Sequence, residues 1–284
     1  MARRRRCAGP PDLTDEPTPR VWHVFATYLA AVAGIFAVSG FAILALISAY
    51  PDVPEEALLR SLPGLLAGSI ASSTALMLTI ALVVRPLEPA RLRLLPGWET
   101  SRALAVMAVG MLTLGQALDS LTALAGFGDR GSMAVIRRAL ETARGPDLFG
   151  AVVVIGVLAG AAEEIFFRGY MQTRLRAYWP APLAVTVTTL CFAILHFDPS
   201  VVHILLAGAL SLYLGFVAEV SDSALPAIVC HVVNNVVFTL QTAFGAAVLD
   251  RTTNVALAVT CAVAFVACVL WLRRAAPRPP AVAR

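Results

Sequence analysis

Long apolar segments separated by short, arginine-bearing connections are the feature that most restricts how this 284-residue chain can fold. A helix needs about 20 apolar residues to cross the hydrocarbon layer of a bilayer, and its backbone polar groups must be satisfied within the segment. Hydrophobic residues make up 58% of the chain and charged residues only 14%, whereas soluble domains carry about 25% charged residues. We therefore expect an all-α fold, a polytopic transmembrane helical bundle.

Eight segments have the composition of membrane spans, although the fifth and sixth are short. They run approximately over Trp22–Ser48, Leu62–Val84, Ala103–Ala125, Asp147–Phe167, Pro182–Phe197, Val201–Ala218, Ala224–Val248 and Thr253–Leu272. We predict a single membrane domain at residues 21–272, with its motif-bearing core at 147–248. A basic N-terminal segment at 1–20 precedes this domain and a tail at 273–284 follows it.

The positions of the arginines predict the orientation, because cytoplasmic connections carry an excess of Lys and Arg. Arginines are frequent in residues 1–20, in the connection between the second and third segments, and after the last segment. Both termini are therefore expected in the cytoplasm. The Arg-rich N-terminus and the short connections are typical of a bacterial cell membrane protein. The same arginines account for the net charge of +4, so nucleic-acid binding is not expected.

The connection at residues 127–146 departs from this pattern. An eight-span count puts it on the outer side, although it is rich in arginine. Its arginines are Arg130, Arg137, Arg138 and Arg144. The apolar residues Met133, Ile136 and Leu140 recur at helical spacing in the same connection, which predicts an amphipathic helix at the membrane interface.

Three polar motifs interrupt the apolar segments. Ionisable groups within spans are costly and usually face a protein interior or a wet cavity, so each motif is a hypothesis of function. The motifs contain Glu163, Glu164 and Arg168 in the fourth segment, Phe192 and His196 in the fifth, and His231, Asn234 and Asn235 in the seventh.

Helical geometry separates the two glutamates. Glu164 and Arg168 have the i, i+4 spacing that favours an ion pair on one helix face. Glu163 lies about 100° further round the helix and lacks that partner. A carboxylate without a fixed cation, beside imidazoles in a partly dry cleft, suits a general base that activates water. We therefore prefer a functional interpretation to one in which both carboxylates only mark the membrane boundary.

Chain distances indicate that the motifs can meet. Glu163 lies 17 residues before Pro180 and His196 lies 16 residues after it. Two helices leaving a turn at Pro180 therefore carry both side chains to the same level. His231 follows the polar boundary at 219–222 by about two and a half turns. The three motifs are expected to converge below the cytoplasmic face.

The two asparagines allow two interpretations. Asn235 lies at i+4 from His231 and Asn234 at i+3, so either amide can lie near the imidazole. An amide donor there can stabilise an oxyanion, or it can join two helices by a hydrogen bond. The sequence leaves open which asparagine serves the site. Structural roles are expected for three other polar residues, Gln116, Asp119 and His203.

At these residues the sequence resembles the CAAX-protease and bacteriocin-processing family of intramembrane proteases, which includes the Ras-converting-enzyme type of CAAX protease. Each motif is weak alone, but their order and spacing agree together. The motifs are EExxxR at Glu163, Glu164 and Arg168, FxxxH at Phe192 and His196, and HxxxN at His231 and Asn235. The resemblance implies an endopeptidase site within the membrane that opens to the cytoplasm.

Carried over by position, the resemblance gives each motif residue a role. Glu163 and His196 would activate the hydrolytic water, and His231 and Asn235 would stabilise the oxyanion. Glu164, Arg168 and Phe192 would support the site. The implied partners are the lipid bilayer and a membrane-associated peptide or protein, either a prenylated CAAX-type or a bacteriocin-like substrate. The substrate and the oligomeric state are not identified.

The resemblance admits both a metalloprotease and a metal-free, glutamate-dependent mechanism. Glu163, His196 and His231 would be an acceptable zinc set with one open position. The chain has no HExxH motif, and its histidines lie on separate segments. The sequence therefore leaves the cofactor open between a divalent metal such as zinc and none.

Two other functions are compatible with the same residues. Intramembrane Glu and His also suit a proton-coupled transporter, although the halves of the chain show no convincing repeat and the ionisable residues concentrate in the second half. A non-catalytic membrane scaffold or immunity protein would use the motifs structurally. Loss of peptide cleavage on substitution of Glu163 or His196 would separate the endopeptidase from both.

Overall fold

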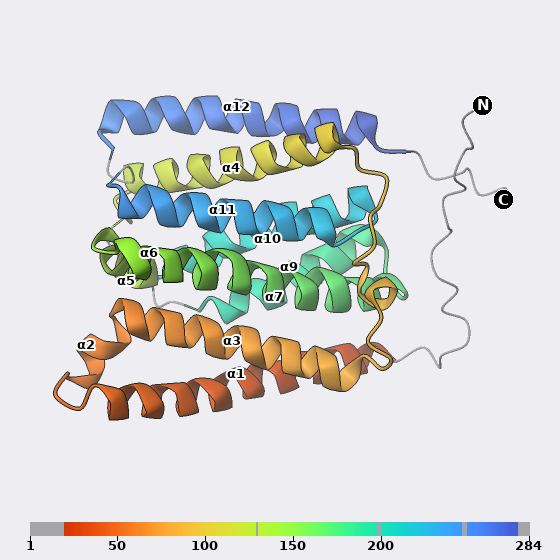
Figure 1. Ribbon diagram of the computed structural model, residues 1–284. Helices are drawn as coiled ribbons and strands as arrows, with labels where there is room; N and C mark the ends of the chain where they lie inside the picture. The colour runs from red at the N-terminus through yellow and green to blue at the C-terminus, as the bar shows by residue number, and fades with distance from the viewer. Residues whose placement is uncertain (1–19, 129, 198–199, 246–248, 278–284) are drawn as a thin grey trace.

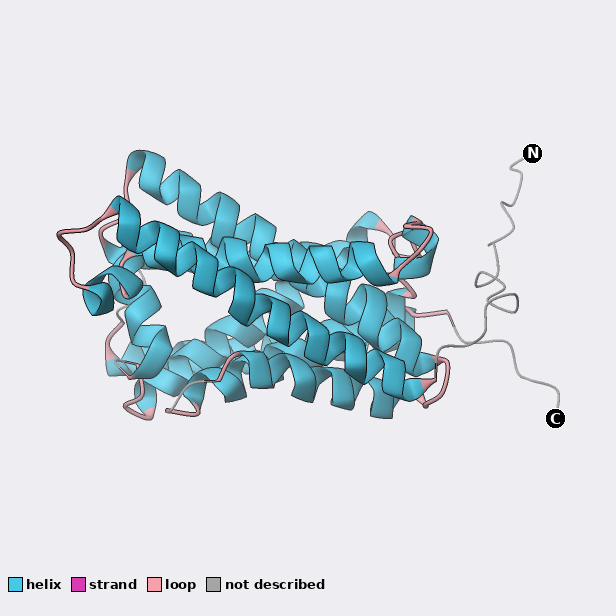
Figure 2. Cartoon of the chain, turned by 90° about the horizontal axis from the view of Figure 1, so that it is seen from below, coloured by secondary structure: helices cyan, strands magenta, loops and turns pink. Residues whose placement is uncertain are grey.

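A computed structural model describes residues 20–128, 130–197, 200–245 and 249–277. These residues are helical or lie in loops, and the described part contains no strand (Figure 2). The expected all-α bundle is therefore confirmed. Most of the predicted segments 1–20 and 273–284 lie outside the described residues.

The first part of the chain is a helical hairpin at one side of the bundle (Figure 1). α1 (Val21–Ala49) packs against α3 (Leu62–Val83), and the short α2 (Glu55–Leu59) connects them. Ser61 caps α3 by accepting a hydrogen bond from the backbone N–H of Gly64, and proline follows within the first turn. A side-chain acceptor and an early proline are common signals of a helix start.

A second pair lies at the opposite side of the bundle (Figure 1). α4 (Ser101–Leu124) follows the short η2 (Pro89–Leu92) and packs along α12 (Arg251–Ala275), which is the last described helix. The motif-bearing helices lie between these two pairs.

The central region contains one continuous helix from Gly145 to Arg176. It consists of α6 (Gly145–Ala151), the π-helical η3 (Val152–Ala159), α7 (Gly160–Glu164), the π-helical η4 (Ile165–Gln172) and α8 (Thr173–Arg176). The two glutamates thus lie on a short α-helical piece between two π-helical stretches, and π-helical turns are frequent at functional sites.

Four further helices surround this long helix. They are α5 (Gly131–Glu141), α9 (Ala181–Leu195), α10 (Val202–Ser221) and α11 (Leu225–Ala243). We call one end of the bundle the termini end, because α1 begins there at Val21 and α12 finishes there at Ala275. The other end is called the α5 end (Figure 1).

Within the described residues, seven helices are long and apolar enough to cross a membrane, so the predicted count of eight is not confirmed. The exception is the fifth predicted segment, whose helix α9 has only 15 residues. At about 1.5 Å per residue it spans about 22 Å, short of a hydrocarbon layer of about 30 Å. α9 ends at Leu195, and its C-cap residue His196 lines a cavity inside the bundle.

The helix predicted in the connection 127–146 is present as α5, but its environment differs from the prediction. Leu140 is fully buried, and Met133 and Ile136 line a cavity inside the bundle. The apolar side of α5 therefore packs against protein, where an interfacial helix would contact lipid.

Candidate active site

The two adjacent glutamates of α7 have different surroundings. Glu164 is fully buried, and its Oε1 accepts hydrogen bonds from Arg168 Nη1 at 2.7 Å and from His231 Nδ1 at 2.8 Å. Glu163 lines the cavity, with its Oε2 3.8 Å from His231 Nε2. The i, i+4 ion pair expected of Glu164 is present, and Glu163 lies outside it.

Arg168 holds three helices together behind the cavity. Its Nη2 donates to the backbone oxygen of Ser211 at 2.8 Å and to the Ser211 hydroxyl at 2.7 Å, so η4 is joined to α10. Its guanidinium also lies 5.1 Å from the centre of the Phe192 ring on α9. Because Arg168 is fully buried, these contacts and Glu164 replace its hydration.

His196 is positioned by the end of α9. Its Nδ1 lies 3.0 Å from the backbone oxygen of Phe192, and its ring lies 4.6 Å from the Phe192 ring. A carbonyl oxygen only accepts, so Nδ1 carries the proton in this contact. The neutral ring then keeps its lone pair on Nε2, where it can take a proton from water.

The seventh-segment motif lies on α11, facing the long helix and α4. The Nδ1 atom of His231 donates a hydrogen bond to Oε1 of Glu164, and Nε2 of His231 faces Oε2 of Glu163. Asn235 donates from Nδ2 to the backbone oxygen of Ile155 in η3 at 3.3 Å, which joins two helices. Asn234 packs so closely on α4 that a methyl group added at Gly115 would lie 2.6 Å from its Oδ1. Both asparagines line the cavity.

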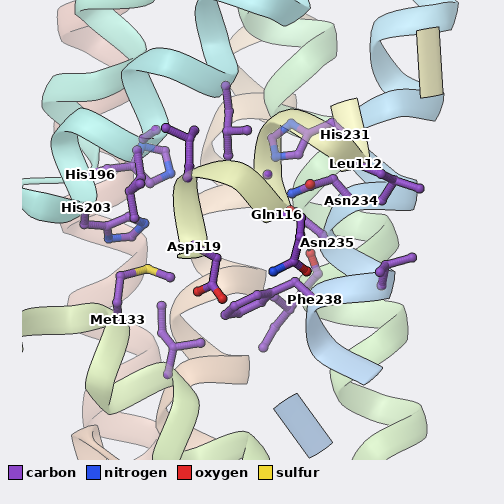
Figure 3. Close-up of a pocket in the computed structure, with 18 of the residues that line it drawn as sticks. Leu112, Gln116, Asp119, Met133, His196, His203, His231, Asn234, Asn235 and Phe238 are labelled. Atoms are coloured by element: carbon purple, nitrogen blue, oxygen red, sulfur yellow. Dashed lines mark hydrogen bonds between the residues drawn. The ribbon is translucent and has the colours of Figure 1, made fainter. Parts of the chain in front are cut away.

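The groups that are not sealed in the protein meet at one cavity of about 530 Å³. In Figure 3, His196 and His203 lie together on one side, and His231, Asn234 and Asn235 lie on the other. The structure thus brings together the four predicted catalytic residues and Phe192, whereas Glu164 and Arg168 lie behind the wall. Most other lining residues are apolar. They include Leu112, Met133, Ile136, Leu206, Leu210 and Phe238.

Three polar residues that we expected to be structural also line this cavity. They are Gln116 and Asp119 on α4 and His203 on α10. The His203 ring lies 5.0 Å from the His196 ring, and its Nδ1 lies 2.9 Å from the Ser132 hydroxyl. The signal was visible in the sequence, since each is a polar residue within an apolar segment. Only the packing of α9 against α10 brings His203 beside His196.

The predicted metal set does not have the geometry of a metal site. In the described parts of the chain, no three His, Cys, Asp or Glu side chains are grouped as metal ligands. These residues do not fit a three-ligand zinc ion, and the metalloprotease interpretation is not supported.

The cavity extends from the middle of the bundle toward the α5 end. Its lining includes Glu163 and His231 near the middle of their helices and two residues of α5. The resemblance implied a site open to the cytoplasm, and the arginines placed both termini in the cytoplasm. Both expectations stay predictions.

Comparison with known proteins gives one result. Residues 145–237 match the family model described as Rce1-like, "Type II CAAX prenyl endopeptidase Rce1-like". This segment contains all three polar motifs. Neither the curated proteins nor the solved structures contain a match to this chain.

Proposed function

Since this chain is a member of the CAAX-protease family through its Rce1-like residues 145–237, we propose that it is an intramembrane endopeptidase in which Glu163 and His196 activate water. The observation that carries the proposal is the convergence of Glu163, His196, His231 and Asn235, from three helices, on one cavity inside the bundle. A cavity with convergent ionisable groups is the expected form of an active site.

The proposed reaction begins at a water molecule between Glu163 and His196. One of them takes a proton as the water oxygen bonds to the peptide carbonyl carbon, and the carbonyl oxygen becomes an oxyanion. In its imidazolium form, His231 donates from Nδ1 to Glu164 and has Nε2–H available for the oxyanion. The carbon–nitrogen bond then breaks, and the abstracted proton passes to the leaving amine.

The second hydrogen of the Asn235 amide is available to the same oxyanion, because the hydrogen bond to Ile155 uses only one of the two. Glu164 acts through His231: its hydrogen bond to Nδ1 directs Nε2 toward Glu163 and the cavity. We assign it as a positioning residue.

The test compares Glu163→Gln and His196→Ala with Glu141→Gln, a control at an exposed glutamate of α5. Cleavage of a peptide library that contains prenylated CAAX-type and unmodified membrane peptides is measured in detergent. Each site variant is expected to lose about 100-fold or more of the activity, because base catalysis contributes that much. The control should keep full activity, and all three should unfold near the wild-type temperature.

Full activity in both site variants would overturn the mechanism. Cleavage is also expected to persist in excess chelator, because the donor set does not fit a metal; loss of activity that zinc restores would contradict this. The library identifies the substrate class, since prenylated CAAX-type peptides and unmodified membrane peptides are separate members of it.

A further inference from the structure

His196, one of the two residues proposed to activate water, lies where its helix has already ended. α9 finishes at Leu195, and His196 is the C-cap residue with φ −95° and ψ 30°, outside helical geometry. The backbone beyond His196 therefore adds no helical turn to hold the imidazole. Because a catalytic group must keep its orientation to within about 10–20°, contacts with other side chains have to fix this ring.

Two aromatic rings from different helices supply such contacts. The Phe192 ring of α9 lies 4.6 Å from the His196 ring, and the backbone oxygen of Phe192 lies 3.0 Å from His196 Nδ1. Phe192 is only 3% exposed and packs edge to face with Phe167 at 5.1 Å. The His203 ring of α10 lies 5.0 Å from the His196 ring at an interplanar angle of 75° (Figure 3). The Phe192 contact comes from the helix that carries His196, whereas the His203 contact depends on a second helix.

The start of α10 indicates how His203 is held. α10 begins at Val202 without a side-chain cap, and Val201 before it has φ 62°, a left-handed conformation that is rare for a β-branched residue. A turn that starts in this way depends on contacts with neighbouring elements. Ser132 of α5 provides one, since its hydroxyl lies 2.9 Å from His203 Nδ1. The first turn of α10 is therefore joined to α5 through the same imidazole that packs against His196.

α5 in turn forms part of the cavity wall. Met133, next to Ser132 in the chain, lines the cavity together with Ile136. The helix packs against α3, α10 and α11. A peptide in the cavity would contact α5 directly, and α5 is connected through Ser132 and His203 to the proposed base.

We propose that His203 is a positioning residue of the active site, and that it links the placement of α5 to the orientation of His196. This inference rests on the proposed endopeptidase function, in which His196 activates water. Contact between the two rings keeps Nε2 of His196 directed at the water, and the hydrogen bond with Ser132 keeps the His203 ring in place. A peptide that packs against α5 acts on the same series of contacts, so binding in the cavity is coupled to the geometry of catalysis.

The kinetics of four variants test the positioning role. His203→Ala removes the ring, His203→Phe keeps a ring but loses both ring nitrogens, and Ser132→Ala removes only the hydroxyl. His23→Ala is the matched control, because His23 is an exposed histidine at the start of α1. kcat and KM are measured in detergent with the library peptide that the wild type cleaves fastest. Unfolding temperatures show that each variant is folded.

The expected result for His203→Ala is a kcat lower by up to about 100-fold with an unchanged KM, because displacement of a catalytic group by about 1 Å costs that much. His203→Phe and Ser132→Ala should both lose less, since each keeps a ring and loses the hydrogen bond. Adding Ser132→Ala to His203→Phe should cause no further loss, because that hydrogen bond is already absent. His23→Ala should match the wild type.

Three kinetic results would overturn the proposal. A kcat of His203→Ala equal to that of His23→Ala would show that the ring positions nothing. A raised KM with an unchanged kcat would make His203 a substrate contact instead. A His203→Phe variant as slow as His203→Ala would show that the ring nitrogens carry the effect, so that the imidazole would act chemically rather than by position.

A spectroscopic measurement separates this inference from the proposed function. The chain has four histidines, so protein labelled with ¹³C at the imidazole Cε1 atoms gives one signal for each, and single His→Gln substitutions assign them. Ser132→Ala is expected to shift or broaden the His196 signal, and to leave it unmoved when His203→Phe is already present. Ser48→Ala, at an exposed serine of α1, is the control and should not change the His196 signal.

An unchanged His196 signal in Ser132→Ala would overturn the link from α5, whether or not the protein cleaves a peptide. A shifted His196 signal in a protein whose wild type cleaves no library peptide would support the link and contradict the proposed function instead.

Discussion

Two polar clusters lie on different faces of α7, and they use consecutive residues of the chain. We call Glu164, Arg168 and Ser211 the sealed cluster, because Glu164 and Arg168 have no exposed surface. We call Glu163, His196, His231 and Asn235 the cavity cluster. In the sealed cluster the charged groups bind one another, whereas the cavity cluster keeps atoms that face open space. Neighbouring carboxylates can thus have a structural and a chemical role, according to the helix face they occupy.

The sealed cluster is incompletely satisfied. In the described structure, Glu164 Oε2 and Arg168 Nε have no hydrogen-bond partner. A buried ion pair often returns little net stability, because the cost of desolvation offsets the attraction. The hydrogen bond from His231 to Glu164 connects the sealed cluster to the cavity cluster. We therefore expect that the sealed cluster contributes mainly by positioning His231.

The largest loss of stability is expected from a substitution that breaks the ion pair of the sealed cluster. Arg168→Leu leaves the buried Glu164 carboxylate without its cation, and removal of one partner of a buried pair costs about 3–5 kcal/mol. The measurement is thermal or denaturant unfolding in detergent. Arg138→Leu, at an exposed arginine of α5, is the matched control and should unfold as the wild type does. Equal unfolding stability of Arg168→Leu and Arg138→Leu would show that loss of the Arg168 cation from the sealed cluster does not destabilise the fold.

The second largest effect is expected from a substitution in the contact between the long helix and α11. A methyl group at Gly156 would lie 2.7 Å from Val236 Cγ2, so Gly156→Ala must displace α11. Overpacking of this kind costs about 1–3 kcal/mol. Activity should fall as well, because α11 carries His231 and Asn235. Both unfolding and cleavage are measured.

The control for this change is Gly68→Ala on α3. A methyl group there meets nothing within 4 Å, so the variant should keep its activity. Its helix propensity improves by up to about 1 kcal/mol. Equal behaviour of the Gly156 and Gly68 variants would contradict the close approach of η3 and α11.

Local geometry explains how much of the site was predictable. The spacing of Glu163, Glu164 and Arg168 within one helix fixes which carboxylate is paired, and the turn near Pro180 brings His196 to the level of Glu163. The bond between His231 and Glu164 was not predicted, because it joins residues 67 positions apart. No periodicity reports such a contact.

The fold shows the same division between local and long-range information. Segment composition predicted the helical bundle and most helix positions. It did not predict that the apolar side of α5 faces a cavity. An apolar face has the same composition against lipid and against protein, so its partner depends on how distant helices pack.

A smaller structural effect is expected at Asn235, which belongs to the cavity cluster. Asn235→Ala removes the hydrogen bond to Ile155, and interhelical hydrogen bonds in membranes contribute about 0.6 kcal/mol on average. Loss of an oxyanion donor would nevertheless lower the turnover rate by about 100-fold or more. Asn234→Ala is the comparison, measured for both unfolding and cleavage. A greater loss of activity in Asn234→Ala would transfer the donor role to Asn234.

The smallest expected effect concerns Asp250, an exposed carboxylate that contrasts with the sealed Glu164. It caps α12 by accepting from the backbone N–H groups of Thr252 at 2.9 Å and Thr253 at 3.0 Å. Hydrogen bonds from the side chain and then the backbone of Thr253 lower the pKa of Asp250 below its ordinary value. When a carboxyl has a lower pKa in the folded state than in the unfolded state, its ionised form stabilises the fold at pH values above the unfolded-state pKa. This stabilisation is lost as the pH falls through the folded-state pKa.

Asp250→Ala should therefore lower the unfolding temperature slightly at neutral pH, and its difference from the wild type should shrink as the pH falls below about 4. Asp250→Asn keeps an uncharged cap, so its stability should vary less with pH than that of the wild type. Unfolding temperatures of the three proteins across this pH range provide the measurement. If the unfolding temperatures of Asp250→Ala and the wild type differed by the same amount at every pH, the charge of this cap, unlike that of the sealed cluster, would add nothing to the stability.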